Sequence, residues 1–305
     1  MSLNSVITNV SAQVALQSLN STQSQLQATQ KRISTGYRVA DATDDGAAFA
    51  VAQRVRADTG ALTTVNQQLG NASGLAQTAL AGLTSVSNNV SSAKNLLAEI
   101  GNTSLSSDQT NQYITSFKAL ITQVANTVDG STYNGQTLLG STDGVTTAAD
   151  KTVISSETGS TIKLNKEDAS TLANALANLI GLTFSRASGV DTFAGTASGG
   201  NAAAASAAQT AALASIATGG GLSTIQTNVA NSLNQAGADS NLLNATISFN
   251  SSKIDALNAG LGALVDADLS KESANLQALQ IRQQLGTQAL SLANQSPQSL
   301  LSLFK

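Results

Sequence analysis

The carboxyl-terminal stretch decides the fold that the rest of the chain must accommodate. It runs Asp266-Ala-Asp-Leu-Ser-Lys-Glu-Ser-Ala-Asn-Leu-Gln-Ala-Leu-Gln-Ile-Arg-Gln-Gln-Leu-Gly-Thr-Gln-Ala-Leu-Ser-Leu-Ala-Asn-Gln-Ser-Pro-Gln-Ser-Leu-Leu-Ser-Leu-Phe-Lys305. Steps of three and four residues alternate along Leu269, Glu272, Leu276, Leu279, Gln283, Gly286, Leu290 and Ala293, which predicts the seam of a coiled coil. Apolar side chains beside this seam widen it: Ile281, Leu285 and Leu292. A helix apolar over so much of its circumference needs burial on several sides, so we predict a helix that packs into an assembly.

The amino terminus shows the same helical periodicity. Residues 3–35 predict one helix on the order of 50 Å long. Its apolar stripe begins with Leu3, Val6, Val10 and Val14, and steps of three and four residues then alternate along Leu16, Leu19, Gln23, Leu26, Gln30 and Ile33. Since neither terminal stripe can be buried alone, we predict that the two ends pair as antiparallel helices rather than lie as unrelated surface helices. The side chains expected to pack within and between subunits are Leu3, Val6, Val10, Val14, Leu19, Leu26, Ile33, Leu269, Leu276, Leu279, Leu290, Leu300 and Leu303.

Composition removes most classes of chemistry. The 305 residues include no Cys, no His and no Trp, and only 11% are charged, less than half of the roughly 25% of ordinary domains. Without Cys or His we expect no thiol nucleophile, no zinc site and no disulfide, and therefore no enzyme, metal or cofactor. A net charge of −3 provides no basic patch for nucleic acid.

Export and membrane signals are also weak. The first residues, Met1-Ser-Leu-Asn-Ser5, lack the basic and apolar regions of a signal peptide. The Ala-rich segment 202–217 is interrupted by polar side chains, so we expect no membrane insertion. An extracellular protein of this sequence would leave the cell without a cleaved signal peptide.

The middle of the chain predicts further helices around a short insert. We expect helices over residues 47–100, 107–128, 202–217 and 222–262, and a β-hairpin from the alternating runs at 152–155 and 161–164. Asp168 is expected to cap a helix over 169–180. Residues 185–201 are rich in Gly, Ser and Thr, which predicts a loop. The predicted fold is mainly α. One domain comprises residues 1–40 plus 265–305, and a helical rod domain comprises 41–264 with the hairpin and a short variable insert near 140–200.

Four short motifs give the chain a resemblance to bacterial flagellin. They are Arg32-Ile-Ser-Thr-Gly-Tyr-Arg-Val-Ala-Asp-Ala-Thr-Asp-Asp45, Tyr133-Asn-Gly-Gln-Thr-Leu-Leu139, Asp266-Ala-Asp-Leu-Ser-Lys-Glu272 and Ala293-Asn-Gln-Ser-Pro-Gln-Ser-Leu-Leu-Ser-Leu303. The residues that carry the family pattern are Arg32, Gly36, Arg38, Asp41, Asp44, Asp45, Asn134, Gly135, Asp266, Asp268, Glu272, Asn294, Gln295 and Pro297. One departure is Leu264-Val265, where flagellins often place Arg-Ile. The short insert implies a form without large outer domains.

The resemblance implies a structural subunit that assembles helically into the flagellar filament for swimming motility. Its implied partners are many copies of itself, an export chaperone, the filament cap and hook-junction proteins, and its implied route is flagellar type III export to the extracellular filament. Two alternatives stay open at this stage, a hook–filament junction protein and a secreted adhesin or hydrolase with a coiled-coil stalk. The pair Asp44-Asp45 suggests a helix cap before it suggests catalysis, because no His or further carboxylate lies nearby.

One segment departs from flagellins that a vertebrate innate receptor senses. In those flagellins the second long helix carries the motif Leu-Gln-Arg-x-Arg-Glu-Leu. The aligned stretch here is Val90-Ser-Ser-Ala-Lys-Asn-Leu96, in which the altered positions are Ser92, Lys94 and Asn95. Because Lys lacks the planar donor fork of Arg, the sequence predicts poor recognition by that receptor.

Overall fold

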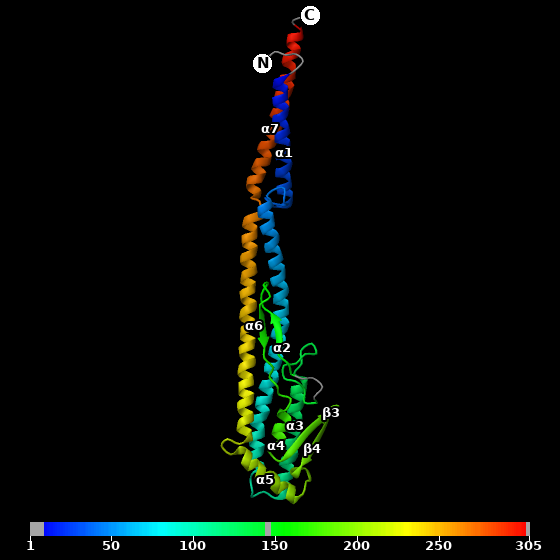
Figure 1. Ribbon diagram of the computed structural model, residues 1–305, viewed down its shortest axis with the longest axis vertical. Helices are drawn as coiled ribbons and strands as arrows, with labels where there is room; N and C mark the ends of the chain where they lie inside the picture. Colours follow the sequence, from blue (N-terminus) through cyan, green and yellow to red (C-terminus); the bar gives the residue numbers. More distant parts are fainter. Residues whose placement is uncertain (1–8, 144–147, 303–305) are drawn as a thin grey trace. The chain divides into compact units, whose positions relative to one another are not determined.

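The computed structural model describes residues 9–143 and 148–302 (Figure 1). It confirms a mainly α fold. The helices are α1 Val10–Thr35, α2 Gly46–Ile100, α3 Ser107–Gly130, α4 Leu172–Asn178, α5 Ala202–Ile216, α6 Gly221–Val265 and α7 Leu269–Ser302. The chain divides into two compact units, the first made of Met1–Gly60 with Ile254–Lys305 and the second of Ala61–Lys253.

In the first unit, α1 and α7 lie side by side, which confirms the predicted pairing of the two chain ends (Figure 1). The Asn9 side chain starts α1 by accepting a hydrogen bond from the Ala12 N–H. Gly36 ends the helix in the left-handed region at φ 75°, and its N–H donates to the Arg32 carbonyl. The helix predicted over residues 3–35 therefore ends where expected, while its first residues, 3–8, lie outside the described part.

The second unit is built around a core of aliphatic side chains from α2, α3, α4 and α6. Phe117 of α3 is fully buried in it, with Ile121 and Val124 on the same face. A capping box starts α3, because the Ser106 side chain accepts from the Gln109 N–H while the Gln109 side chain accepts from the Ser106 N–H. The Ala-rich α5 packs beside α3 through Ala208 and Ala212.

The predicted hairpin forms from β1 Lys151–Ile154 and β2 Thr161–Leu164, paired antiparallel. Its turn is attached to α6 in the same unit. Glu157 forms an ion pair with Lys253, and the Asn250 amide donates to the Ser155 carbonyl at 3.0 Å. The hairpin is therefore held by side-chain contacts with α6 as well as by the backbone hydrogen bonds between its two strands.

The prediction of a loop over residues 185–201 is wrong. Strands β3 Leu182–Ala187 and β4 Val190–Gly195 form a second antiparallel hairpin there. Ser188 and Gly189 both have positive φ, 50° and 78°, as a two-residue hairpin turn requires. The rings of Phe184 and Phe193 pack against each other across the strands in a tilted arrangement, with centroids 5.4 Å apart. The Gly, Ser and Thr residues of this stretch lie in the turn and on the strands, so their abundance alone does not predict a loop.

The helix predicted over residues 169–180 is also longer than the observed α4, which spans Leu172–Asn178. The Asp168 carboxylate does not cap it. Instead it accepts hydrogen bonds from the N–H and hydroxyl of Ser170, which close a local turn before the helix.

Two glycines of α2 serve close packing rather than merely weakening the helix. A Cβ at Gly82 would lie 2.1 Å from the Ser131 Oγ, and a Cβ at Gly74 would lie 2.8 Å from the Tyr133 ring. Ser131 is buried, and its hydroxyl donates to the Thr127 carbonyl at 2.6 Å. The turn after α3 therefore reaches α2 only because these positions have no side chain.

We predict that Gly82→Ala destabilises the second unit, because the added methyl group displaces Ser131 from a buried position. Overpacking of this kind costs about 1–3 kcal/mol. The matched control is Gly70→Ala on the same helix, where nothing lies within 4 Å of the added Cβ. That change is expected to stabilise by up to about 1 kcal/mol through helix propensity. Urea unfolding followed by circular dichroism measures both; equal effects of the two variants would contradict the close-packing role.

Candidate assembly surfaces

The seam between α1 and α7 follows the predicted spacing closely on α7. Seven of the eight predicted positions are buried or half-buried, while Leu269, at 50%, is exposed. On α1 the less exposed positions are Ala12, Ala15, Leu19, Thr22, Leu26, Thr29 and Ile33. Thr22 and Thr29 thus occupy the seam where the sequence pattern placed Gln23 and Gln30. Their smaller side chains let the two helices approach closely.

Polar contacts fix the register of this pair. The Asn9 amide donates to the Ala293 carbonyl at 2.8 Å, and the Gln283 amide donates to the Gln23 side-chain oxygen at 2.7 Å. At the other end of α1, Arg32 Nη1 lies 3.5 Å from Glu272 Oε1. Because the α7 partners descend in sequence, from Ala293 through Gln283 to Glu272, while the α1 side ascends, the contacts establish an antiparallel pair over the described length of α1.

A second set of apolar side chains on the same helices is left exposed beside the seam. Val14 of α1 is 61% exposed, and Leu285 and Leu292 of α7 are 57% and 70% exposed. Val10, Leu16 and Ile281 are also about half exposed or more. One partner helix therefore covers only part of each apolar stripe, as the width of the carboxyl-terminal stripe predicted.

The predicted packing residues accordingly fall into two groups. Leu19, Leu26, Ile33, Leu276, Leu279 and Leu290 lie in the seam, whereas Val10, Val14 and Leu269 are exposed in the single chain. Leu3, Val6 and Leu303 lie outside the described residues, as do the side chains of Pro297 and Leu300. A role of the exposed group in contacts between subunits stays a prediction.

The two motif-bearing connectors meet in space. The Arg38 N–H donates to the Val265 carbonyl at 2.7 Å, the Ala267 N–H donates to the Gly36 carbonyl at 2.9 Å, and Tyr37 pairs with Asp266 in an isolated β-bridge. The Arg38 guanidinium also donates to the Leu264 carbonyl. Beneath these bonds, Val39 and Val265 are buried against Ala48 and Ala52. The family motifs here build one junction from both ends of the chain.

The acidic motif residues have structural partners. Lys31 Nζ donates to Asp41 at 2.6 Å and to Asp44 at 3.0 Å, and these bonds hold the pKa of both carboxyls below the ordinary range. The Asp45 carboxylate accepts from the N–H groups of Ala47 and Ala48 and caps the start of α2. The expected capping role of this acidic pair therefore falls to Asp45. The described residues contain no group of three or more carboxylates placed to hold a metal.

The remaining motif residues are placed as follows. Asn134 and Gly135 form a tight turn at φ 49° and 72°, closed by hydrogen bonds between the backbones of Tyr133 and Gln136. The Asp268 carboxylate accepts from the Ser270 and Lys271 N–H groups at the start of α7. Asn294 and Gln295 are exposed on α7. The altered receptor positions Ser92, Lys94 and Asn95 are exposed on α2.

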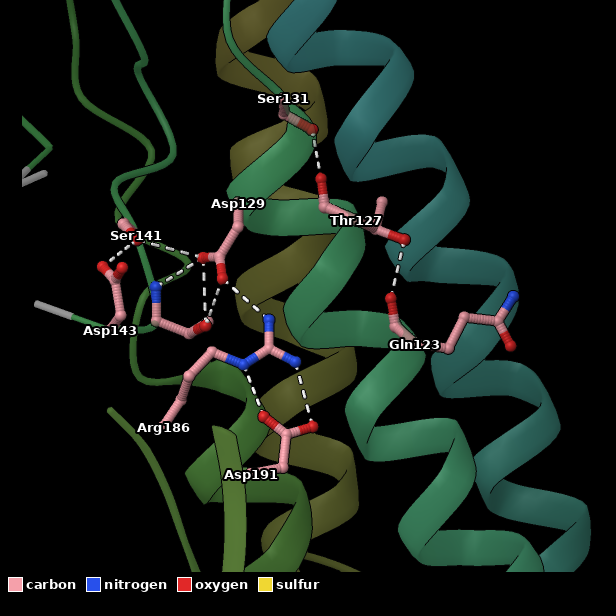
Figure 2. Close-up of polar contacts among 9 residues, drawn as sticks. Gln123, Thr127, Asp129, Ser131, Ser141, Asp143, Arg186 and Asp191 are labelled. Atoms are coloured by element: carbon pink, nitrogen blue, oxygen red, sulfur yellow. Dashed lines mark hydrogen bonds and ion pairs between the residues drawn. The ribbon is translucent and has the colours of Figure 1, made fainter. Parts of the chain in front are cut away.

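A buried arginine that the sequence did not single out anchors the second hairpin (Figure 2). Arg186 of β3 has a side chain only 6% exposed, and its guanidinium pairs through Nε and Nη2 with both oxygens of Asp191 on β4. Its Nη1 donates to Asp129, at the end of α3, at 2.8 Å. Asp129 also accepts from the Thr142 N–H at 2.7 Å. One cation thus joins the hairpin, α3 and the segment after the Asn134–Gly135 turn.

The electrostatics of this cluster favour the charged forms. The Arg186 guanidinium lowers the pKa of Asp191, and the two carboxylates raise the pKa of Arg186. The spacing of Arg186 and Asp191 could have indicated this ion pair, because residues five apart across a two-residue turn face each other on neighbouring strands. The sequence pattern predicts a loop there instead of a hairpin, so it does not reveal the pair.

Comparison with known proteins identifies the family. The model of the bacterial flagellin N-terminal helical region matches residues 6–144, and that of the C-terminal helical region matches residues 221–304. The chain belongs to the bacterial flagellin family. It is 34% identical to flagellin FljK of Caulobacter vibrioides over the full length of both chains. It is 33% identical to a flagellin of Brucella melitensis over 99% of each. Flagellin C of Rhizobium meliloti is 29% identical over 99% of this chain and 100% of its own.

Membership of the family establishes the general function. Flagellins are structural proteins, so this flagellin is a subunit of the extracellular filament of the bacterial flagellum, built from many copies. The two matched regions contain α1–α3 and α6–α7, while the second hairpin lies between them. Within the described residues no helix has the length and apolarity to cross a membrane.

We predict that Arg186→Met destabilises the second unit by about 3 kcal/mol, because it leaves two carboxylates without their counter-charge at a largely buried position. The triple variant with Asp129→Asn and Asp191→Asn is expected to recover part of the loss, since its neutral groups need no cation. Chemical unfolding at neutral pH measures the difference. An Arg186→Met variant as stable as the wild type would show that the cluster contributes nothing.

Acid should weaken the same cluster. Because the folded-state pKa of Asp191 is lowered, its contribution is present above the ordinary value of about 3.9 and is lost as pH falls through the lowered pKa. The stability gap between wild type and Arg186→Met is therefore expected to shrink below about pH 4. Unfolding curves measured from pH 2 to 7 test this, and a constant gap over that range would contradict it.

Proposed function

We propose that the exposed faces of α1 and α7 are the surfaces through which copies of this flagellin join in the filament. The observation that carries the proposal is the exposure of Leu285 and Leu292 on a helix that α1 already covers along its seam. A contact between different faces of identical subunits grows into an open helical filament when the rotation between subunits does not close a ring. On this proposal residues 1–40 and 265–305 form the inner domain, and 41–264 form the rod with a short variable insert near 140–200.

The charge pattern supports dense packing of these helices. From Val10 to Gln30 α1 carries no charged side chain, and from Ser273 to Ser302 α7 carries Arg282 alone. Like charges brought together in a low-dielectric interior repel strongly. Helices rich in Gln, Ser, Thr and Asn avoid that repulsion while keeping hydrogen-bonding groups for their neighbours.

The proposed partners beyond the homopolymer are an export chaperone, the filament cap and the hook-junction proteins, and the proposed route is flagellar type III export without a cleaved signal peptide. These follow from family membership. The relatives named above are flagellins, so a junction protein or an adhesin is not favoured.

We predict that Leu285→Gln combined with Leu292→Gln prevents normal polymerisation while leaving the monomer folded. Each exposed Leu that a neighbour buries contributes about 2 kcal/mol, so the critical concentration is expected to rise at least about tenfold. Sedimentation of seeded, purified protein and negative-stain microscopy measure it. The matched control is Gln284→Ala with Gln288→Ala, two exposed polar positions on the same helix. Wild-type filaments from the double Leu variant would refute this assembly surface.

A second prediction concerns the receptor positions. Ser92, Lys94 and Asn95 are exposed, so their identities do not affect the α2 core, and a receptor would meet Ser in place of one Arg and Lys in place of the other. Loss of one charged hot-spot residue costs about 2 kcal/mol, or about thirtyfold in affinity. We expect weak activation of the vertebrate receptor by depolymerised protein in a reporter-cell assay.

The gain-of-function variant Ser92→Arg/Lys94→Arg/Asn95→Glu should raise activation without changing thermal stability. Activation by the wild type at the concentrations that suffice for a flagellin with the Arg-rich motif would disprove the prediction.

A further inference from the structure

The connector between β2 and α4, residues 165–169, is held on two sides within the second unit. The Glu167 and Ala169 N–H groups each donate at 2.9 Å, to the carbonyls of Leu138 and Leu139 respectively. On the other side, the Asn165 N–H donates to Asp239 of α6 at 3.0 Å. The connector thus joins the segment after the Asn134–Gly135 turn to α6, and α4 and the second hairpin follow directly from it.

The Glu167 side chain points into this joint rather than into solvent. The residue is 7% exposed, and the Ser232 hydroxyl of α6 lies near its carboxyl. Asp239, two turns further along α6, is 5% exposed and acts on Glu167 as a like charge. Two carboxyl groups therefore lie in one buried region between the connector and α6.

The two carboxyls are solvated very differently. Asp239 accepts hydrogen bonds from the Asn165 N–H and, at 2.8 Å, from the Gln235 amide. Glu167 interacts with one hydroxyl and faces the Asp239 charge. A carboxyl that is desolvated beside a like charge favours its proton.

The other charged groups around the joint are engaged elsewhere. Asp150 of the loop before β1 accepts from the Lys166 N–H and pairs with Lys163 of β2 at 2.7 Å. Asp168 accepts from Ser170. The cleft beside the connector is lined by Asp168 itself, by Leu83 of α2 and by Ile225, Asn228 and Val229 of α6, and Asp168 is the titratable residue of its lining. Among the described residues no Lys or Arg forms an ion pair with Glu167.

We propose that the Glu167 carboxyl is a proton-operated catch, which holds the 165–169 connector against α6 when it is neutral and loosens the connector when it is ionised. Burial raises the pKa of Glu167, and the Asp239 charge adds to that rise. A raised pKa gives stabilisation that is complete below the ordinary value of about 4.3 and is lost as pH rises through the raised value. The catch responds to pH in the opposite direction from the Arg186 cluster. It does not depend on the proposed assembly surfaces.

Hydrogen exchange of the full-length monomer, corrected for the intrinsic pH dependence of exchange, tests the catch. Peptides covering residues 165–170 and 228–240 are expected to lose protection as pH rises from 4 to 8, by about tenfold for each unit by which the folded pKa exceeds the ordinary one. In Glu167→Gln, whose amide imitates the neutral acid in shape, the same peptides should stay protected across the range. The matched control is Glu99→Gln, an exposed Glu on α2, which should behave like the wild type.

Protection of these peptides in the wild type that does not change with pH, or an identical pH dependence in Glu167→Gln, would overturn the proposal. A carboxyl carbon-13 titration of the wild type provides a readout that does not depend on any variant folding. A Glu167 midpoint clearly above about 4.3 supports the catch, and a midpoint at or below that value overturns it. Because both measurements use the monomer, their failure would leave the proposed assembly surfaces unaffected.

Discussion

The incomplete burial of α1 and α7 by each other is the constraint on which this flagellin depends. The seam between them takes small and medium side chains such as Ala15, Thr22 and Gly286, and this lets the backbones come close. The larger apolar side chains Leu285 and Leu292 remain outside it. Since burial of apolar surface drives both folding and association, the apolar surface that this helix pair leaves over is the surface that we propose further copies cover.

The junction below this pair shows why the family motifs lie at opposite ends of the chain. Arg38 and Gly36 exchange backbone hydrogen bonds with Val265 and Ala267, and Lys31 holds the loop through Asp41 and Asp44. The motifs are therefore a set of caps and bridges that end α1, start α2 and lead into α7. Their carboxylates are occupied by backbone N–H groups and a lysine, which gives them a structural explanation in place of a catalytic one.

In the second unit, tightly packed apolar side chains are supplemented by a few buried charges at the joints. Arg186 satisfies two carboxylates at once and becomes less effective in acid, whereas Glu167 lacks a cation and is accommodated best when it is protonated. Both sites fasten the segment between residues 129 and 195 to the long helices. The short insert is thus tied to the helical core by electrostatics, with opposite responses to pH at its two attachments.

The sequence by itself determined the long helices, the pairing of the chain ends, the first hairpin and the family. These features follow from local periodicity, caps and motifs, which survive without knowledge of neighbours. The tertiary structure decided the features that depend on contacts between residues far apart in the sequence. It placed Thr22 and Thr29 in the seam instead of Gln23 and Gln30, formed β3 and β4 from a Gly/Ser/Thr-rich stretch, and required Gly74 and Gly82 for close contact. It also brought Arg186 to Asp129 and Glu167 near Asp239, because burial and charge contacts between residues far apart in sequence leave no local pattern to read.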